Sequence, residues 1–381
     1  MTTAPGLFLA RLRLTDFRSW LGLDARFDAS LICIAGENGA GKTNLLEAIS
    51  LLAPGRGLRG ARMGELGRQE DGAGLPWAAA GRFETRSGPM DIGTGTDPEG
   101  ATERRIYRLD GQALRSQAML AERMAAVWIT PQMDRLFQEG ASGRRRFLDR
   151  LVWALEPGHA REVAAHDNAM AERNRLLAEG RADPAWLAGL EDAMARHAVA
   201  VAAARRALML RLNAELAAGR ATGAFPVARL EIACPILAAL ADTPALAVED
   251  ALRQGLAQDR RRDAAAGGAA RGAHKADLSL IHMPKVISAE FCSTGEQKAL
   301  LVSVVLAHAA LIAEARGFAP LLLLDEVAAH LDPVRREALF AALAALPAQV
   351  FMTGTDAEVF APLAGIGQRF GVADGRLFAM G

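Results

Sequence analysis

Aromatic residues and cysteines are both scarce in this chain. Phe, Trp and Tyr together make up 5% of the 381 residues, and Tyr107 is the single tyrosine. Proteins that bind single-stranded nucleic acid without sequence preference stack its bases on aromatic side chains, so this composition argues against a stacking platform. The three cysteines, Cys33, Cys234 and Cys292, are scattered and odd in number. That pattern argues against a disulfide framework and favours a reduced, cytoplasmic compartment.

The chain also lacks net charge and long apolar runs. It has 44 basic and 44 acidic residues, so overall charge does not draw it toward nucleic acid, and any DNA contact must use local patches. The N-terminus has no signal-like stretch, and no run of about 18 apolar residues occurs. We therefore expect a cytoplasmic protein without a membrane partner, and its length predicts two or three domains.

A glycine-rich segment at residues 36–43 reads Gly-Glu-Asn-Gly-Ala-Gly-Lys-Thr. An apolar run of strand character, residues 30–35, precedes it, and residues 43–52 have helical spacing. Such a turn brings backbone N–H groups and a helix N-terminus to phosphate oxygens, whereas a chance glycine-rich turn is the alternative. Lys42 is expected at the β- and γ-phosphates and Thr43 at Mg²⁺. The predicted nucleotide-binding residues here are Gly36, Glu37, Asn38, Gly39, Ala40, Gly41, Lys42, Thr43 and Asn44.

Two carboxylates follow a buried apolar run near the other end of the chain. Residues 321–324 are four leucines, typical of a parallel strand, and Asp325 and Glu326 come directly after them. Asp325 is expected to help hold Mg²⁺, and Glu326 to polarise the attacking water. The alternative is a buried strand that ends in solvated acids.

A third polar segment, residues 292–298, opens an apolar helix predicted over residues 298–315. Ser293 is a natural N-cap, and Glu296 three residues later completes a capping box, which is a purely structural interpretation. A helix N-terminus with Ser and Gly is also an anion site. Because the phosphate loop already has that role within one chain, this second site would serve a nucleotide presented by another subunit.

The nucleotide motifs lie at both ends of the chain, so the ends are expected to fold together around an insertion. We predict an α/β head built from residues 1–143 and 256–381, with a mainly helical arm over residues 144–255. In the first part, strands are expected at residues 7–16, 77–84, 104–109 and 127–130. In the arm, helices are expected at residues 162–180 and 184–219, followed by a looser segment over residues 235–272.

The order of these motifs resembles the ABC-type ATPase heads of the SMC kind. The order is phosphate loop, Gln132, the segment 293–297, Leu-Leu-Asp-Glu and Leu331-Asp332. Within that group the chain resembles the RecF family of bacterial recombination mediators. The stretches that carry this resemblance are residues 14–19, 36–49, 54–59, 143–149 and 272–278.

The resemblance implies roles for further residues. Gln132 would sense Mg²⁺ and the γ-phosphate, Asp332 would couple two sites across a dimer, and Arg18 would lie near the nucleotide, although a surface turn is equally consistent with Arg18. The segment of a second subunit would contribute Ser293, Gly295, Glu296 and Gln297 to the bound ATP. The family implies ATP hydrolysis in a head-to-head homodimer that acts on duplex or gapped DNA and loads recombinase with a RecR-type partner.

The chain departs from the family pattern at three places. Residues 272–277 read Gly-Ala-His-Lys-Ala-Asp where the family usually has Gly-Pro-His-Arg-Asp-Asp, which leaves any role of Lys275 open. In the segment after Ser293, Thr294 and Glu296 replace commoner residues. Thr353 and Thr355 stand where related ATPases carry a switch histidine, and His330 is expected to be structural rather than a base.

Two arginine clusters, residues 144–146 and 260–262, are the candidate DNA contacts. Such runs are most often solvated surface, and contact with the phosphate backbone is the second interpretation. Two other functions fit the head motifs, namely an ABC transporter ATPase subunit and a non-catalytic scaffold gated by nucleotide.

Overall fold

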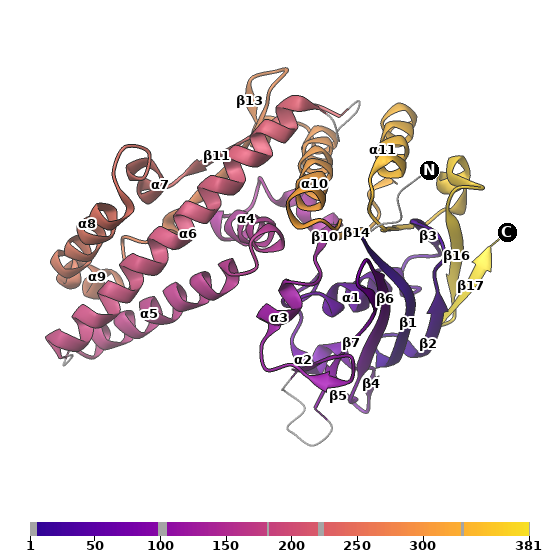
Figure 1. Cartoon of the computed structure of the whole chain (residues 1–381), viewed down its shortest axis with the longest axis horizontal. Coiled ribbons are helices and arrows are strands. Elements are labelled where there is room, and N and C mark those ends of the chain that lie inside the picture. Colours follow the sequence, from indigo (N-terminus) through magenta and orange to yellow (C-terminus); the bar gives the residue numbers. More distant parts are fainter. Residues whose placement is uncertain (1–5, 98–104, 181–182, 220–224, 329–330, 381) are drawn as a thin grey trace. The chain divides into compact units, whose positions relative to one another are not determined.

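The fold of the chain was analysed in a computed structural model, which describes residues 6–97, 105–180, 183–219, 225–328 and 331–380. The chain forms two compact units (Figure 1). The first unit comprises residues 1–134, 218–227 and 293–381, and the second comprises residues 135–217 and 228–292. The two ends of the chain therefore fold together, as predicted. His330 and Arg104 lie outside the described residues.

A largely parallel sheet forms the centre of the first unit, in the order β10-β14-β15-β3-β16-β17. Its strands are β3 (Leu31–Ala35), β10 (Ala126–Ile129), β14 (Leu321–Leu324), β15 (Val350–Gly354), β16 (Gln368–Ala373) and β17 (Arg376–Met380). All strands but β17 run parallel, so their carboxyl ends lie at one edge of the sheet. The phosphate loop follows β3 and Asp325 follows β14, which brings both to this edge.

A second, antiparallel sheet has the order β2-β1-β6-β7-β8-β9. Its strands are β1 (Leu7–Phe17), β2 (Trp20–Arg26), β6 (Ala78–Thr85), β7 (Gly88–Thr96), β8 (Arg105–Leu109) and β9 (Gln112–Ala113). Helix α1 (Lys42–Leu52) packs on β6 of this sheet and on β15 of the parallel sheet. The fully buried Gln349 joins the two sheets, because its side-chain amide pairs with the N–H and C=O of Leu9 at 2.7 and 3.1 Å.

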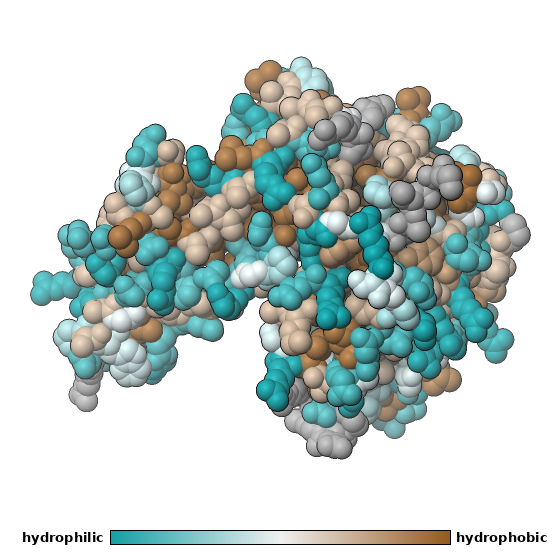
Figure 2. Space-filling model, in the orientation of Figure 1, coloured by the Kyte–Doolittle hydropathy of each residue, from teal (hydrophilic) through white to brown (hydrophobic). Residues whose placement is uncertain are grey.

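Helices α10 (Thr294–Arg316) and α11 (Pro333–Ala345) complete the first unit with several short elements. These are α2 (Met63–Leu66), β4 (Gln69–Glu70), β5 (Ala73–Gly74), α3 (Gln117–Ala121), η1 (Pro131–Arg135) and η5 (Ala357–Leu363). Among the described helices, α10 alone is long and apolar enough to cross a membrane, with a mean hydropathy of 1.8. However, 78% of its most apolar stretch is buried inside the protein. Helix α10 is therefore a core helix. On the molecular surface, hydrophilic residues are interspersed with hydrophobic ones over the face shown in Figure 2.

The second unit is built on a helical hairpin and a small antiparallel sheet. The hairpin consists of α5 (His159–Glu179) and α6 (Pro184–Ala218), preceded by α4 (Ala141–Leu155). The sheet has the order β11-β12-β13, with β11 (Ala228–Ala233), β12 (Asp277–His282) and β13 (Ile287–Ser288). The remaining elements are α7 (Pro235–Ala239), α8 (Ala245–Gln258), α9 (Arg260–Ala266), η2 (Ala273–Lys275) and η3 (Ala289–Phe291).

The predicted loose segment over residues 235–272 is wrong, since it contains three helices. Its prolines and glycines end or begin helices instead of breaking them: Pro235 opens α7, Pro244 is the N-cap of α8, and Gly267 is the left-handed C-cap of α9 with φ 72°. The predicted arm limits, 144–255, also need to move. Residues 256–292 belong to the second unit because β12 pairs with β11 along its whole length.

Candidate nucleotide and catalytic site

The phosphate loop lies between β3 and α1 and leaves the start of α1 open. Gly39 and Gly41 have φ 83° and 109°, a left-handed conformation that favours glycine. A Cβ on Gly41 would lie only 2.7 Å from Ser19 Oγ, so a larger residue does not fit. Within the described chain no side chain caps α1. Its first N–H groups therefore remain available to an anion, as the sequence predicts.

The Lys42 ammonium is folded back onto the loop. Lys42 Nζ donates to the carbonyls of Gly36 and Glu37 at 2.7 and 2.9 Å and lies 4.0 Å from Glu326 Oε1. The side chain is 4% exposed, and burial lowers the pKa of Lys42 while the carboxylates of Glu326 and Asp325 act in the opposite direction. A cation held by neutral carbonyls can exchange them for phosphate oxygens, which bind it more strongly.

Asp325 meets Thr43 across the edge of the parallel sheet. Thr43 Oγ1 lies 2.9 and 3.0 Å from the two carboxylate oxygens of Asp325. A third residue, Thr353 at the end of β15, donates its hydroxyl to Asp325 Oδ1 at 2.7 Å. Hydroxyl and carboxylate oxygens are the hard ligands that Mg²⁺ prefers. Among the described residues no group of three or more His, Cys, Asp or Glu could hold a metal by itself.

Glu326 has an unusual backbone that its neighbours hold in place. Its φ is 52°, a left-handed conformation that costs a residue other than glycine about 1–3 kcal/mol. The Glu326 N–H donates to Thr353 Oγ1 at 3.0 Å, and Lys298 Nζ donates to the Glu326 carbonyl at 3.4 Å. Sequence reasoning treated Thr353 only as the replacement for a switch histidine and missed this contact. The pairing of β14 with β15 creates it.

Gln132 reaches the same edge from β10. β10 pairs with β14, and the Asp325 N–H donates to the Ile129 carbonyl at 2.9 Å, so η1 with Gln132 begins beside the acidic pair. Gln132 itself is exposed. Two residues later, Asp134 lies 3.8 Å from Lys298 Nζ.

The segment at Ser293 forms the capping box that the sequence allows. Ser293 is the N-cap of α10, and Glu296 Oε2 accepts from the Ser293 N–H at 2.9 Å and from Ser293 Oγ at 3.0 Å. Gln297 is fully buried, so its predicted contact with a nucleotide of another subunit is not supported. The reason is that nearly every residue of α10 from Gln297 to Ile312 is buried.

Helix α11 begins beside the start of α10. A Cβ on Gly295 would lie 3.9 Å from Arg335 Nη1 of α11. Asp332 is the N-cap of α11, accepts from the Arg335 N–H at 2.9 Å and lies 3.6 Å from Arg335 Nε. Asp332 and Ser293 thus each cap the start of a helix, and the Arg335 side chain reaches from one start to the other.

Arg18 binds the chain itself. Its guanidinium holds the buried Glu47 of α1 through two bonds of 2.9 and 3.0 Å and donates to the Glu65 carbonyl at 2.6 Å. Arg59 also reaches Glu47, at 3.0 Å, and Asn44 Oδ1 at 2.8 Å. Arg18 therefore supports the helix behind the phosphate loop, and direct contact with the nucleotide is not supported. Sequence reasoning missed Glu47, whose helical position alone does not distinguish it.

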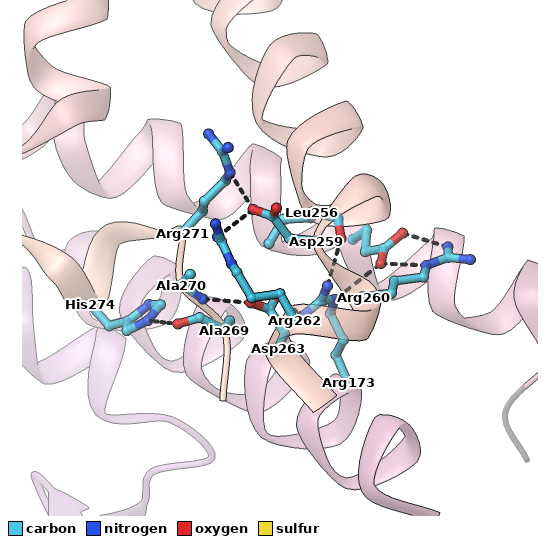
Figure 3. Close-up of polar contacts among 11 residues, drawn as sticks. Arg173, Leu256, Asp259, Arg260, Arg262, Asp263, Ala269, Ala270, Arg271 and His274 are labelled. Atoms are coloured by element: carbon cyan, nitrogen blue, oxygen red, sulfur yellow. Dashed lines mark hydrogen bonds and ion pairs between the residues drawn. The ribbon is translucent and has the colours of Figure 1, made fainter. Parts of the chain in front are cut away.

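Four arginines of the two clusters bind groups of the second unit, whereas Arg146 and Arg261 are exposed, so contact of the clusters with the phosphate backbone stays a prediction. Arg144 forms two bonds of 2.7 and 2.8 Å with Asp277, and Arg145 donates to the Ala276 carbonyl at 3.0 Å. Figure 3 shows the other cluster, where Arg260 binds Glu191 at 2.8 and 2.6 Å and Arg262 binds Asp259 at 2.7 Å. The carboxylates of Asp277, Glu191 and Asp259 thus pair with three of these four guanidinium groups, and a backbone carbonyl holds Arg145.

The chain is similar to a known protein family, to bacterial proteins and to solved structures. The family model described as RecF/RecN/SMC N terminal domain matches residues 8–372. The DNA replication and repair protein RecF of Rhizobium johnstonii is 45% identical over 97% of this chain and 98% of that protein. A solved structure of the recombination mediator protein RecF with ATPrS has a TM-score of 0.85 at 20% identity and covers 100% of both chains. An SMC head bound to the C-winged helix domain of ScpA has a TM-score of 0.56 at 15% identity, over 98% of this chain and 97% of that one.

Proposed function

The chain belongs to the RecF family of SMC-type ATPases, and from that premise we propose that it is an ATP-dependent DNA-binding switch in DNA repair and replication. The observation that carries the proposal is the contact of Thr43 with Asp325, two residues 282 positions apart in the chain. This contact joins the phosphate loop to the acidic strand end, and Lys42 and Glu326 lie 4.0 Å apart at the same place.

ATP binding uses the phosphate loop. Lys42 exchanges the carbonyls of Gly36 and Glu37 for the β- and γ-phosphates, while the open start of α1 receives phosphate oxygens. Thr43 and Asp325 fit Mg²⁺ because their oxygens converge, and phosphates and water would complete its coordination. The ion, when bound, neutralises charge on the phosphates.

Hydrolysis relies on Glu326 and Gln132. The Glu326 carboxylate orients a water for attack on the γ-phosphorus, the bond from that phosphorus to the bridging oxygen breaks, and ADP and phosphate leave. The left-handed backbone of Glu326, fixed by Thr353, directs the carboxylate toward Lys42. Gln132, at the end of β10, senses whether the γ-phosphate is present.

Two copies are proposed to close on two ATP molecules in a head-to-head homodimer. Ser293 and Gly295 of one copy reach the γ-phosphate held by the other, and Asp332 contacts the partner beside them. ATP binding stabilises this dimer on duplex or gapped DNA, and hydrolysis releases it. We further propose that a RecR-type partner joins the dimer in the cytoplasm to help load recombinase. Arg146 and Arg261, the exposed members of the two arginine clusters that bind no group named above, are candidates for the DNA contact.

Sedimentation velocity with and without ATP, on gapped duplex DNA, tests this function. Wild type should dimerise with ATP, whereas Lys42→Met should stay monomeric because the β- and γ-phosphates lose the Lys42 ammonium. Lys275→Met, the same change at an exposed lysine, should behave like wild type. Glu326→Gln should keep the dimer after wild type has spent its ATP and separated.

Three outcomes would contradict parts of the proposal. Equal sedimentation of wild type and Lys42→Met would remove the role of ATP in dimerisation. Dimerisation without phosphate release, identical in wild type and Glu326→Gln, would favour a non-catalytic scaffold. ATP hydrolysis without any ATP-dependent DNA binding would contradict the DNA-binding switch.

A further inference from the structure

Lys298 is a buried ammonium group that the proposed reaction does not use. It is the fifth residue of α10, five positions after Ser293, and its side chain is 3% exposed. Burial lowers the pKa of Lys298, while Asp134 and Glu326 favour its charged form. Removing an ammonium from water is unfavourable unless its partners compensate for the lost hydration. The partners of Lys298 therefore indicate why a lysine stands at this position.

Those partners come from two other elements of the same unit. Lys298 Nζ donates to the backbone carbonyl of Glu326 at 3.4 Å and lies 3.8 Å from Asp134 Oδ2. Glu326 follows β14, and Asp134 belongs to η1, the element that also carries Gln132. One side chain of α10 thus meets the two segments to which the reaction assigns its water-orienting and sensing residues.

The contact with Glu326 involves a strained residue. A left-handed conformation persists in a residue other than glycine only where its surroundings fix it. At Glu326 both sides of the residue are fixed, since its N–H binds Thr353 at 3.0 Å and its carbonyl binds Lys298. Thr353 also binds Asp325, so it has a second task. Lys298 contacts Glu326 from α10, an element separate from β15, which carries Thr353.

We infer that Lys298 is a positioning residue, which fixes the backbone of Glu326 so that its carboxylate points at the attacking water. The inference rests on the proposed function, because it assigns Lys298 to the hydrolytic step of that reaction. Loss of the ammonium releases the Glu326 carbonyl and leaves Asp134 without this cation. Binding of ATP does not depend on Lys298, since Lys42, Thr43 and Asp325 bind through other atoms.

The test compares Lys298→Met, Lys298→Gln and Lys298→Arg with Lys275→Met, a methionine substitution at an exposed lysine. Steady-state phosphate release gives kcat and KM for ATP, and sedimentation gives ATP-driven dimerisation. Lys298→Met should lower kcat about 10- to 100-fold, the effect of losing one charged hydrogen bond, with KM and dimerisation unchanged. Lys298→Arg should restore part of kcat, and Lys275→Met should leave all three quantities unchanged.

Several results would overturn the inference. One is a kcat of Lys298→Met equal to that of Lys275→Met; another is a loss of kcat that Lys298→Arg does not relieve. If Lys298→Met does not fold, Lys298→Gln decides, because a folded glutamine variant with wild-type kcat also contradicts a positioning role. A wild-type protein that hydrolyses no ATP would instead refute the proposed function itself.

Discussion

Arg173 offers a direct test of how the second unit is stabilised. Its guanidinium is fully buried and donates to Glu191 Oε1 at 3.1 Å, Asp263 Oδ2 at 2.9 Å and the Leu256 carbonyl at 2.7 Å (Figure 3). Both carboxylates are 1% exposed. The Arg173→Met variant retains an apolar side chain at this position. Of the contacts that Asp263 makes in this network, only the one with the Ala270 N–H, at 3.0 Å, remains.

The expected loss is large because a buried charge is left without its partner. Breaking such a pair lowers the free energy of unfolding by about 3–5 kcal/mol. Glu191 keeps Arg260, at 2.6 Å, so the charge of Asp263 causes most of the loss. The double variant Arg173→Met/Asp263→Asn, which removes that charge, should therefore recover part of the stability. Urea denaturation followed by far-UV circular dichroism measures each free energy.

Arg175 provides the matched control on the same helix. Arg175 is 53% exposed and pairs with Glu172 and Glu179 at 2.7 Å. Water and salt screen such a pair, so Arg175→Met should change stability little. If Arg175→Met and Arg173→Met lost the same stability, burial would not govern these ion pairs and the reasoning would be wrong.

Two further predictions concern single carboxylates. Glu296→Gln should tighten ATP-driven dimerisation several-fold in sedimentation, because the carboxylate that occupies the N–H and Oγ of Ser293 also repels a phosphate; unchanged dimerisation would show that Glu296 does not compete with nucleotide. Burial acts to raise the pKa of Asp149, but hydrogen bonds from His159 and Arg205 outweigh it and lower that pKa below 3.8. Asp149 therefore stabilises the fold above pH 3.8, and this contribution is lost as the pH falls through the lowered value. Stability measured from about pH 5 to 3 should fall more steeply for wild type than for Asp149→Asn, and parallel curves would contradict the assignment.

The parts of the site that could be predicted are those with local signals. The glycine pattern before Lys42 and the leucine run before Asp325 each determine a turn or a strand by short-range chemistry. The parallel sheet then brings both strand ends together. Pro244 and Gly267 are equally local signals, but they favoured a loose segment, because the same residue types both interrupt helices and mark their ends.

Sequence reasoning missed residues whose contacts depend on how the strands and helices pack against one another. Thr353 contacts Asp325 because β15 lies beside β14, and the sequence around residue 353 does not indicate this strand pairing. The contact of Lys298 depends likewise on how α10 packs. Helix α10 is apolar on most of its surface, so its sequence could not show that Gln297 points into the core.

The distance of 282 positions between Thr43 and Asp325 has a consequence for synthesis of the protein. The ribosome delivers the phosphate loop early, then the residues of the second unit, and only afterwards the strand that carries Asp325. A nascent chain therefore contains the glycine-rich loop and the helical hairpin before the residues that complete the proposed nucleotide site have been made. Synthesis of the last quarter of the chain then brings Asp325 to Thr43 and completes the site that we propose for ATP.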